Sequence, residues 1–239
     1  MNLTAMAAGS LRKALPAMAE AAGLRLDVRF GPAGLLRERI VAGDRPALFL
    51  SASLRHAKTV ARLGDYGPAV EILENSLCLF GREALLADGD ALRAMLDPDG
   101  RLGMSTPGAD PGGDYALAVF DRAETLRPGC AAILRDRARS LVGGIVPGQD
   151  GPGRSPVADL FAQGRVDLFL GYRTTAMDVL ERCPGLALLD LPPELSVRPV
   201  YGAMALKRGG APAALDRLLS PEALAAAEPF GFRAARRDG

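Results

Sequence analysis

Small and hydroxyl-bearing residues follow several short apolar stretches of this chain. Ser10 lies in "AAGSL", Ala33 and Gly34 lie in "FGPAGLL", and Gly112 and Gly113 lie in "DPGGDYA". We expect a helix to begin at each junction, where the first backbone N–H groups have no acceptor within the helix and carry a partial positive charge. Three such junctions predict a cradle for an anion. Each one taken singly also fits an N-cap or a turn with a purely structural role.

Two carboxylates, Asp110 and Asp114, flank the paired glycines. Asp in such places commonly caps a helix or closes a turn, so we expect that role rather than acid–base chemistry. Both residues still bear on ligand choice. A site made only of donors suits fully deprotonated molybdate, tungstate or sulfate, whereas protonated phosphate also needs an acceptor such as a carboxylate.

Residue types that bind metals or act as nucleophiles are few and scattered. Cys78, Cys130 and Cys183 are far apart and form no paired motif, so we expect buried or incidental thiols and no metal site. His56, the only histidine, has no Ser or Cys partner in a recognisable catalytic context, and we expect it on the surface. The sequence shows no nucleophile–base pair and no cofactor lysine motif. We therefore expect no enzyme activity and no cofactor.

Composition narrows the class of partner. The chain has 239 residues, of which 49% are hydrophobic and 24% charged, as in an ordinary globular protein. A net charge of +1 gives no electrostatic case for nucleic acid, and an aromatic content of 5% without Trp gives few stacking platforms. No run of about 18 apolar residues predicts a membrane span. A small polar ligand and a protein are therefore the two classes of partner that the composition leaves open.

Alternating strand and helix patterns predict the elements that would position these residues. Residues 24–30 alternate between apolar and charged side chains, which is typical of a strand with one exposed face. Helical spacing over 11–22 is interrupted at Pro16, which predicts a kink or an irregular first turn. Further strands are expected at 47–51, 76–80, 101–105, 166–172 and 197–206, and further helices at 53–63, 91–96, 115–123, 212–218 and 221–227. The order favours mostly parallel sheets covered by helices.

Several of these stretches, taken in order, resemble a known family. They are "AAGSLRKAL", "FGPAGLL", "LFLSAS", "ENSLCLF", "DPGGDYA", "VDLFLGYRTTA" and "LLSPEALAAAEPFGF". Together they make the chain similar to the molybdate-binding proteins of bacterial ABC importers, with the type II periplasmic-binding-protein fold. The resemblance implies an α/β protein of two lobes joined by two hinge strands. Lobe I would take residues 1–77 and 199–239, and lobe II residues 78–198.

The resemblance also implies a set of ligand contacts. The family holds a tetrahedral oxyanion between its lobes with hydroxyls and backbone N–H groups. Ser10 matches a hydroxyl and N–H donor, and Gly112 matches a backbone N–H donor. Tyr172 matches the family tyrosine whose hydroxyl points at the anion. The remaining N–H contact falls near Arg154 and Ser155, in the Gly- and Pro-rich stretch 143–156.

Three positions depart from the family pattern. Ala33 stands at the second family serine, so that hydroxyl is missing. Arg154 places a charge where the family does not, and it either enters the cleft or points to solvent. Ala47 stands where many relatives have Asp. These departures keep oxyanion binding as the expectation and put molybdate itself in doubt.

The implied function is capture of an oxyanion, with molybdate or tungstate ahead of sulfate, by a monomer that delivers it to an ABC permease. A cytoplasmic anion sensor or store, a partner-dependent effector domain, and a binder of a different small anion are the alternatives. The chain enters an apolar strand at Leu3 without a signal-peptide pattern. We expect a periplasmic protein if a leader precedes this numbering, and a cytoplasmic one otherwise.

Overall fold

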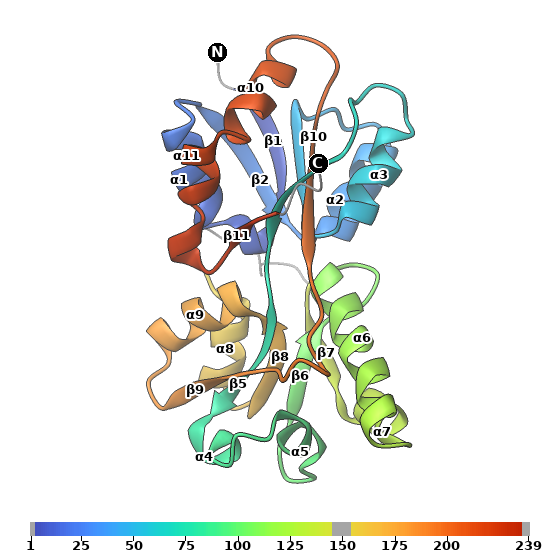
Figure 1. Ribbon diagram of the computed structural model, residues 1–239, viewed down its shortest axis with the longest axis vertical. Helices are drawn as coiled ribbons and strands as arrows, with labels where there is room; N and C mark the ends of the chain where they lie inside the picture. The colour runs from blue at the N-terminus through green and yellow to red at the C-terminus, as the bar shows by residue number, and fades with distance from the viewer. Residues whose placement is uncertain (1–2, 145–153, 236–239) are drawn as a thin grey trace. The chain divides into compact units, whose positions relative to one another are not determined.

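The computed structural model describes residues 3–144 and 154–235. Its contacts divide the chain into two compact units (Figure 1). Unit 1 comprises Met1–Asn75 and Pro199–Gly239, and unit 2 comprises Ser76–Arg198. The chain therefore passes from unit 1 to unit 2 after Asn75 and returns after Arg198.

Unit 1 is built on a six-stranded sheet with the order β11-β4-β10-β3-β1-β2. Its strands are β1 (Leu3–Ala8), β2 (Leu26–Gly31), β3 (Leu48–Ser51), β4 (Val70–Glu74), β10 (Val200–Ala205) and β11 (Arg233–Ala234). β1 pairs in parallel with β2 and β3, whereas β10 runs antiparallel between β3 and β4. The carboxyl ends of β1, β2, β3 and β4 therefore lie at one edge of the sheet, where β10 begins.

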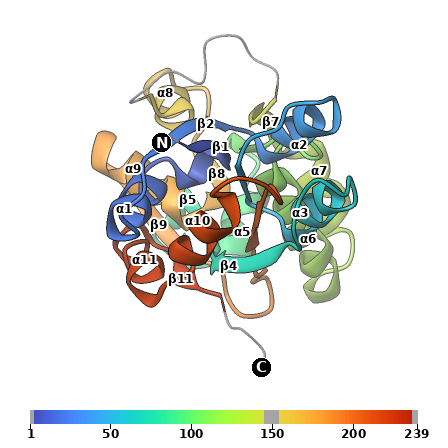
Figure 2. The same cartoon turned by 90° about the horizontal axis from the view of Figure 1, so that it is seen from above.

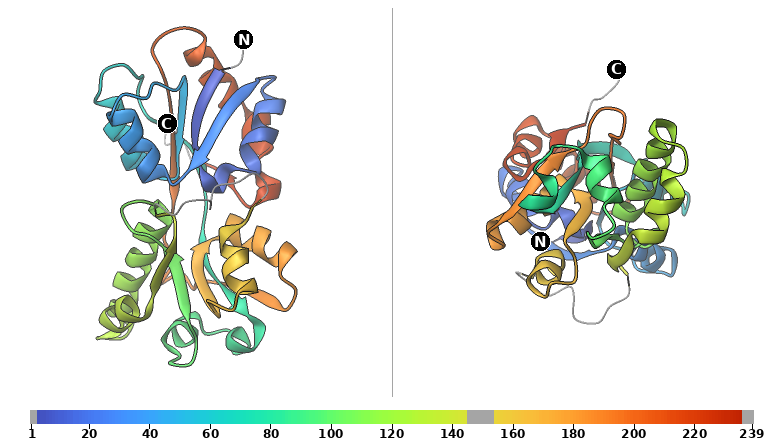
Figure 3. Two further views of the ribbon diagram at one scale, coloured as in Figure 1. Left: turned by 180° about the vertical axis from the view of Figure 1, so that it is seen from behind. Right: turned by 90° about the horizontal axis from the view of Figure 1, so that it is seen from below.

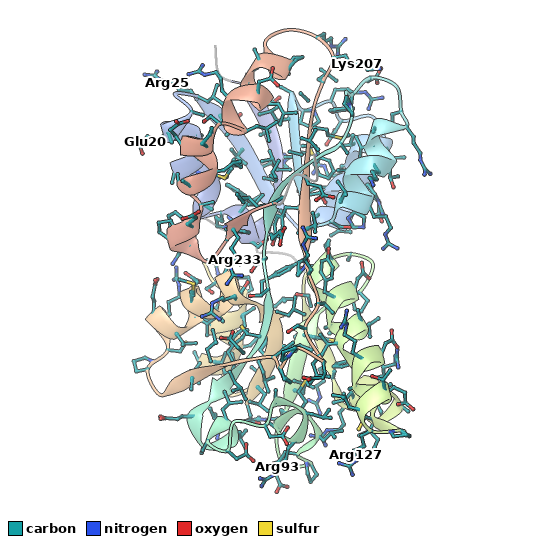
Figure 4. All side chains as sticks on the ribbon, viewed as in Figure 1. Glu20, Arg25, Arg93, Arg127, Lys207 and Arg233 are labelled. Atoms are coloured by element: carbon teal, nitrogen blue, oxygen red, sulfur yellow. The ribbon has the colours of Figure 1, made fainter. Side chains whose placement is uncertain are left out.

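Helices cover both faces of this sheet. They are η1 (Gly9–Leu11), α1 (Ala14–Ala21), α2 (Ala33–Val41), α3 (Leu54–Ala61), α10 (Ala211–Leu218), α11 (Pro221–Ala225) and η2 (Glu228–Phe230). α1 packs on α11, and α2 packs on α3. Figure 2 shows these two pairs on opposite sides of the sheet. Charged side chains of unit 1 such as Glu20 and Arg25 point outward (Figure 4).

Unit 2 is built on a five-stranded sheet with the order β7-β6-β8-β5-β9. Its strands are β5 (Leu77–Arg82), β6 (Leu102–Ser105), β7 (Arg139–Val142), β8 (Leu168–Tyr172) and β9 (Leu186–Asp190). Its helices are α4 (Glu83–Leu86), α5 (Ala91–Leu96), α6 (Pro111–Leu126), α7 (Cys130–Arg137), α8 (Pro156–Ala162) and α9 (Arg173–Arg182). α6 and α7 pack together, as do α8 and α9, and Figure 3 shows the two pairs on either side of the sheet.

Burial follows the sequence patterns. β2 is an edge strand whose Asp27 and Arg29 are exposed, which explains its alternation. β3 and β8 are buried along their whole length, as their continuous apolar runs predict. Pro16 lies in the first turn of α1, where its missing N–H removes no helical hydrogen bond. The helix begins only at Ala14, after the separate 3-10 turn Gly9–Leu11, so the expected helix over 11–22 starts irregularly.

The expected α/β class is confirmed, with one refinement of its sheets. Both sheets are mixed, because β10 and β11 in unit 1 and β5 in unit 2 run against their neighbours. β10 is also shorter than the expected strand 197–206. None of the described helices is long and apolar enough to cross a membrane.

Candidate functional site

In unit 1, the predicted residues gather at the edge where the parallel strands end. Ser10 lies in the 3-10 turn after β1, and Ala33 and Gly34 begin α2 after β2. Ala33 and Gly34 are buried, and Pro32 precedes them as the N-cap. Because the carboxyl ends of β1 and β2 are paired, the structure brings these three residues to one edge of the sheet. This is where ligands sit in open α/β sheets.

Tyr201 at the start of β10 belongs to the same edge, and the sequence patterns did not identify it. Its hydroxyl oxygen lies 2.7 Å from Ser10 Oγ. The side-chain amide of Asn75, at the end of β4, donates to the same hydroxyl oxygen over 3.3 Å. The only sequence signal was a tyrosine inside an otherwise small and apolar strand. Its partner Ser10 is 191 residues away, so no local pattern could connect the two.

Two further serines at this edge were also missed. Ser51 ends β3 and is fully buried, and Ser53 is the N-cap residue of α3. The N–H of Ser53 donates to Ser51 Oγ over 3.1 Å. A Ser–Ala–Ser run directly after an apolar strand was the available signal.

In unit 2, the paired glycines form the first turn of α6, but their N–H groups already have acceptors. The N–H of Gly112 donates to Asp110 Oδ1 over 3.0 Å, and the N–H of Gly113 donates to the Asp110 carbonyl over 2.9 Å. Asp114 Oδ1 accepts from the N–H of Gly108 over 2.9 Å. The expected capping and turn roles of Asp110 and Asp114 are therefore confirmed.

Close packing explains why both positions before Asp114 are glycine. A Cβ on Gly113 would lie 2.5 Å from the Pro107 nitrogen and 2.5 Å from the Ser105 carbonyl oxygen. A Cβ on Gly112 would lie 3.1 Å from Cε2 of Tyr172. The glycines thus allow α6 to begin directly against the end of β6 and the tyrosine ring.

Tyr172 ends β8 and lies at the same edge of the unit 2 sheet as this helix start. It is buried, and its ring meets the Tyr115 ring edge-on with centroids 6.4 Å apart. Because β8 and β6 are parallel neighbours, their carboxyl ends place Tyr172 beside Gly112, 60 positions apart in the chain. The structure therefore brings together the predicted residues Gly112, Gly113 and Tyr172.

The Asp110 carboxylate gives this edge a negative group. Burial raises the pKa of Asp110 above its ordinary value, and the nearby Asp114 adds to the rise. Hydrogen bonds from the Gly112 N–H and the Ser105 side chain oppose the rise. A group that is more easily protonated than usual can act either as an acceptor or, when protonated, as a donor.

Arg154 and Ser155 lie just before α8. The Arg154 side chain is 54% exposed and pairs with Asp159 of α8 over 2.9 Å. Ser155 is buried and is the N-cap residue of α8. Residues 145–153 of the Gly- and Pro-rich stretch lie outside the described residues. The expected roles of Arg154 and Ser155 in binding stay predictions.

His56 corrects one expectation. Its side chain is 1% exposed rather than on the surface. His56 lies four residues before the buried Val60, so both lie on the inner side of α3, which packs on α2 and β10. Cys78 and Cys130 are buried, as expected of structural thiols, and burial raises the pKa of Cys78 to about 12. Among residues 3–144 and 154–235, no cluster of His, Cys, Asp and Glu suits a metal ion.

A groove of about 430 Å³ lies elsewhere in unit 1. It runs between α1 and β2, with Leu15, Ala19 and Val28 among its lining residues. It includes none of the predicted ligand residues. Glu20 and Arg25 also line it, so its wall is mixed and differs from the set of hydroxyl and N–H donors expected for an oxyanion site.

Comparisons with known proteins agree with this architecture. The sequence profile of the bacterial extracellular solute-binding proteins matches residues 3–233. The Pasteurella multocida (strain Pm70) protein called "Uncharacterized protein PM1146" is 35% identical over 202 residues, covering 82% of this chain and 83% of its own.

Two solved structures share the fold at low sequence identity. The periplasmic molybdate-binding protein of Azotobacter vinelandii superposes with a TM-score of 0.75 at 17% identity, over 98% of this chain and all of its own. The sulfate-binding protein SubI of Mycobacterium tuberculosis H37Rv superposes with a TM-score of 0.76 at 14% identity, over 98% of this chain and 87% of its own. The fold is therefore that of the type II periplasmic binding proteins.

Proposed function

We propose that this chain, which belongs to the family of bacterial extracellular solute-binding proteins, captures a small oxyanion for uptake by an ABC importer. The observation that carries the proposal is the gathering of neutral donors at the strand ends of each unit. Ser10, Ala33 and Gly34 gather in unit 1, and Gly112 and Tyr172 gather in unit 2. Neutral donors bind a dianion strongly once water is excluded.

The proposed contacts are a hydroxyl and N–H from Ser10, the Tyr172 hydroxyl, and N–H groups at the starts of α2 and α6. Ala33 offers its N–H but no hydroxyl. At α6 the anion would take the place of Asp110 as acceptor for the Gly112 N–H. Arg154 and Ser155 complete the proposed set, with Gly34 and Gly113 in the same first turns.

Molybdate or tungstate is our first choice of ligand and sulfate our second. The similarity in fold to a molybdate-binding and a sulfate-binding protein supports a tetrahedral oxyanion in general. We further propose that the protein acts in the periplasm as a monomer and delivers its ligand to an ABC permease.

Asp110 favours a second candidate, a protonated phosphate group. Its carboxylate lies at the start of α6, so this edge offers a hydrogen-bond acceptor as well as donors. A hydrogen phosphate could donate its proton to Asp110 and accept from the neutral donors. Phosphate therefore belongs in any test of ligand identity.

The test is a thermal-melting panel of molybdate, tungstate, sulfate and phosphate. A ligand present at 100 times its Kd adds about 2.7 kcal/mol of stability, which raises Tm by about 5 °C for a chain of this size. Calorimetry on Tyr172→Phe should then show about tenfold to hundredfold weaker binding of the stabilising anion, because one donor to a charged ligand is lost. If no anion raises Tm at millimolar concentration, the proposed function is wrong.

A further inference from the structure

We infer that Tyr201 positions the Ser10 hydroxyl, so that Ser10 presents its proton to the bound anion. The inference rests on the proposed function and deepens it. It assigns a role to Tyr201 and Asn75, neither of which belongs to the predicted contact set. All three residues belong to unit 1.

The three side chains form a chain of hydrogen bonds at the strand-end edge. The Asn75 amide nitrogen donates to the Tyr201 hydroxyl oxygen over 3.3 Å, and that oxygen lies 2.7 Å from Ser10 Oγ. Tyr201 is fully buried and Asn75 is 7% exposed. Ser10 is only partly buried, so it is the member of the chain with access to a ligand.

The backbone and its neighbours hold the Tyr201 ring in place. The pairing of β10 with β4 shifts register between Tyr201 and Gly202, and such irregularities re-aim a side chain. The ring meets the Phe232 ring edge-on, with centroids 5.2 Å apart and planes at 86°. Its hydroxyl is thus supported by packing rather than by the hydrogen bonds alone.

The inferred arrangement gives this chain of hydrogen bonds a direction. An amide NH₂ can only donate, so the Tyr201 oxygen is the acceptor from Asn75. Either hydroxyl could donate across the 2.7 Å contact; in the inferred arrangement Tyr201 donates its proton to Ser10 Oγ. Ser10 Oγ accepts it, which leaves the serine proton for a third group. That group is an unprotonated oxygen of the anion.

This arrangement assigns Tyr201 a positioning role. Without its hydroxyl, Ser10 Oγ loses the donor that fixes its rotamer and its proton direction. The donor to the anion is then no longer preorganised, and affinity falls although Ser10 itself is unchanged. A purely structural role would lower stability and leave affinity as it was.

The test is a double-mutant cycle of Tyr201→Phe and Ser10→Ala, read by calorimetry with molybdate and, in parallel, sulfate. Tyr201→Phe keeps the ring and should weaken binding by about tenfold. In the Ser10→Ala background the same change should cost less than about twofold, because Tyr201 acts through Ser10. Equal losses in both backgrounds, or no loss in either, would overturn the inference.

Tyr66→Phe is the matched control. Tyr66 is also a buried tyrosine of unit 1, and its hydroxyl donates to the Pro46 carbonyl over 2.9 Å. This variant should lose stability and keep its anion affinity. If Tyr201→Phe does not fold, as judged by melting, Asn75→Ala tests the chain from its other end, and an unchanged affinity there overturns the inference.

Failure of the proposed function is distinguishable from failure of this inference. If the unmodified protein binds neither molybdate, sulfate, tungstate nor phosphate, the proposed function fails and the role of Tyr201 fails with it. If it binds one of them and Tyr201→Phe binds equally well, only the inference fails.

Discussion

Asp110 shows how one residue can decide the character of an anion site. Its side chain caps α6 by accepting from the Gly112 N–H, which is one of the donors proposed for the ligand. An anion and a carboxylate compete for the same donor and repel each other. The raised pKa of Asp110 reduces that repulsion as the pH falls, because the protonated form carries no charge.

We expect Asp110→Asn to bind sulfate more tightly than the unmodified protein at pH 7, by about threefold to tenfold. Asn also caps helices well, so α6 should still form. Sulfate keeps its charge as the pH falls below 7, so the unmodified protein should gain affinity toward acid pH, where Asp110, with its raised pKa, takes up a proton sooner than an ordinary carboxyl. The Asp110→Asn profile should be flatter, and calorimetry at pH 7, 6 and 5 measures both.

Equal sulfate affinity of the two proteins at every pH would place the anion away from α6. Asp88→Asn is the control. Asp88 is a carboxylate of the same unit that pairs with Arg93 on the exposed surface, and its change should leave sulfate affinity unaltered.

At the scale of the element, the start of α6 depends on close contact between backbones. The helix follows β6 through Ser105–Pro107 and turns back so tightly that Gly113 lies against that segment. Asp110 at the N-cap and Pro111 in the first turn both favour initiation at this point. The glycines are therefore explained by packing, whether or not an anion binds there.

Gly113→Ala should lower the free energy of unfolding by about 1–3 kcal/mol, because the new Cβ lies 2.5 Å from backbone atoms that cannot rotate away. Gly210→Ala is the matched control. Gly210 precedes α10 with φ −82°, and a Cβ there meets nothing within 4 Å. Because Gly210 is the N-cap of α10 and Ala caps less well than Gly, its substitution should cost no more than about 0.5–1 kcal/mol. Urea unfolding measures both, and equal stabilities would contradict the packing argument.

At the scale of the molecule, each unit has a polar strand-end edge and its own stabilising core. In unit 2 the opposite edge of the sheet carries Asp167, which is 5% exposed. Its carboxylate accepts from Arg101 Nε at 2.6 Å and Nη2 at 2.9 Å, and it forms an ion pair with Arg82 Nε over 2.8 Å. Other charged side chains of unit 2, such as Arg93 and Arg127, point outward (Figure 4).

These contacts make the stability of the protein depend on acid pH. The hydrogen bonds and charge of Arg101, with the charge of Arg82, lower the pKa of Asp167 from 3.8 to about 2. A carboxyl with a lowered folded-state pKa contributes stability above its unfolded pKa, and loses it as the pH falls from about 4 to about 2. Asp167→Asn should therefore cost about 2 kcal/mol at pH 7 and much less near pH 2.

Urea unfolding at pH 7, 4 and 2.5 measures this difference. Asp121→Asn removes an exposed partner of Arg135 in the same unit and should have almost no effect at any pH. A cost for Asp167→Asn that is the same at pH 2.5 as at pH 7 would show that packing, rather than the ion pairs, accounts for the loss.

Local patterns in the sequence were sufficient for much of the fold. The period-two alternation at 24–30, the apolar run at 47–51 and the helical spacing after Ser53 depend only on neighbours in the chain, and each element forms. The strand–helix junctions also predicted the helix starts at Ala33–Gly34 and at Gly112–Gly113. The strands β4, β7, β9 and β11 were missed. β4 and β7 are short runs of mixed polarity, which give a weak period, and β11 has only two residues.

Only the tertiary structure decided the partners of the site residues. Tyr201 meets Ser10 from 191 positions away, because β10 returns antiparallel beside β3 and brings its first residues to the ends of the parallel strands. His56 is buried because α3 packs on both α2 and β10, which its own helical pattern does not reveal. The sequence by itself determined most of the elements, their order and the donor types. Contacts between distant segments depend on strand register and packing. Only the tertiary structure therefore determined which of those donors form hydrogen bonds to other residues.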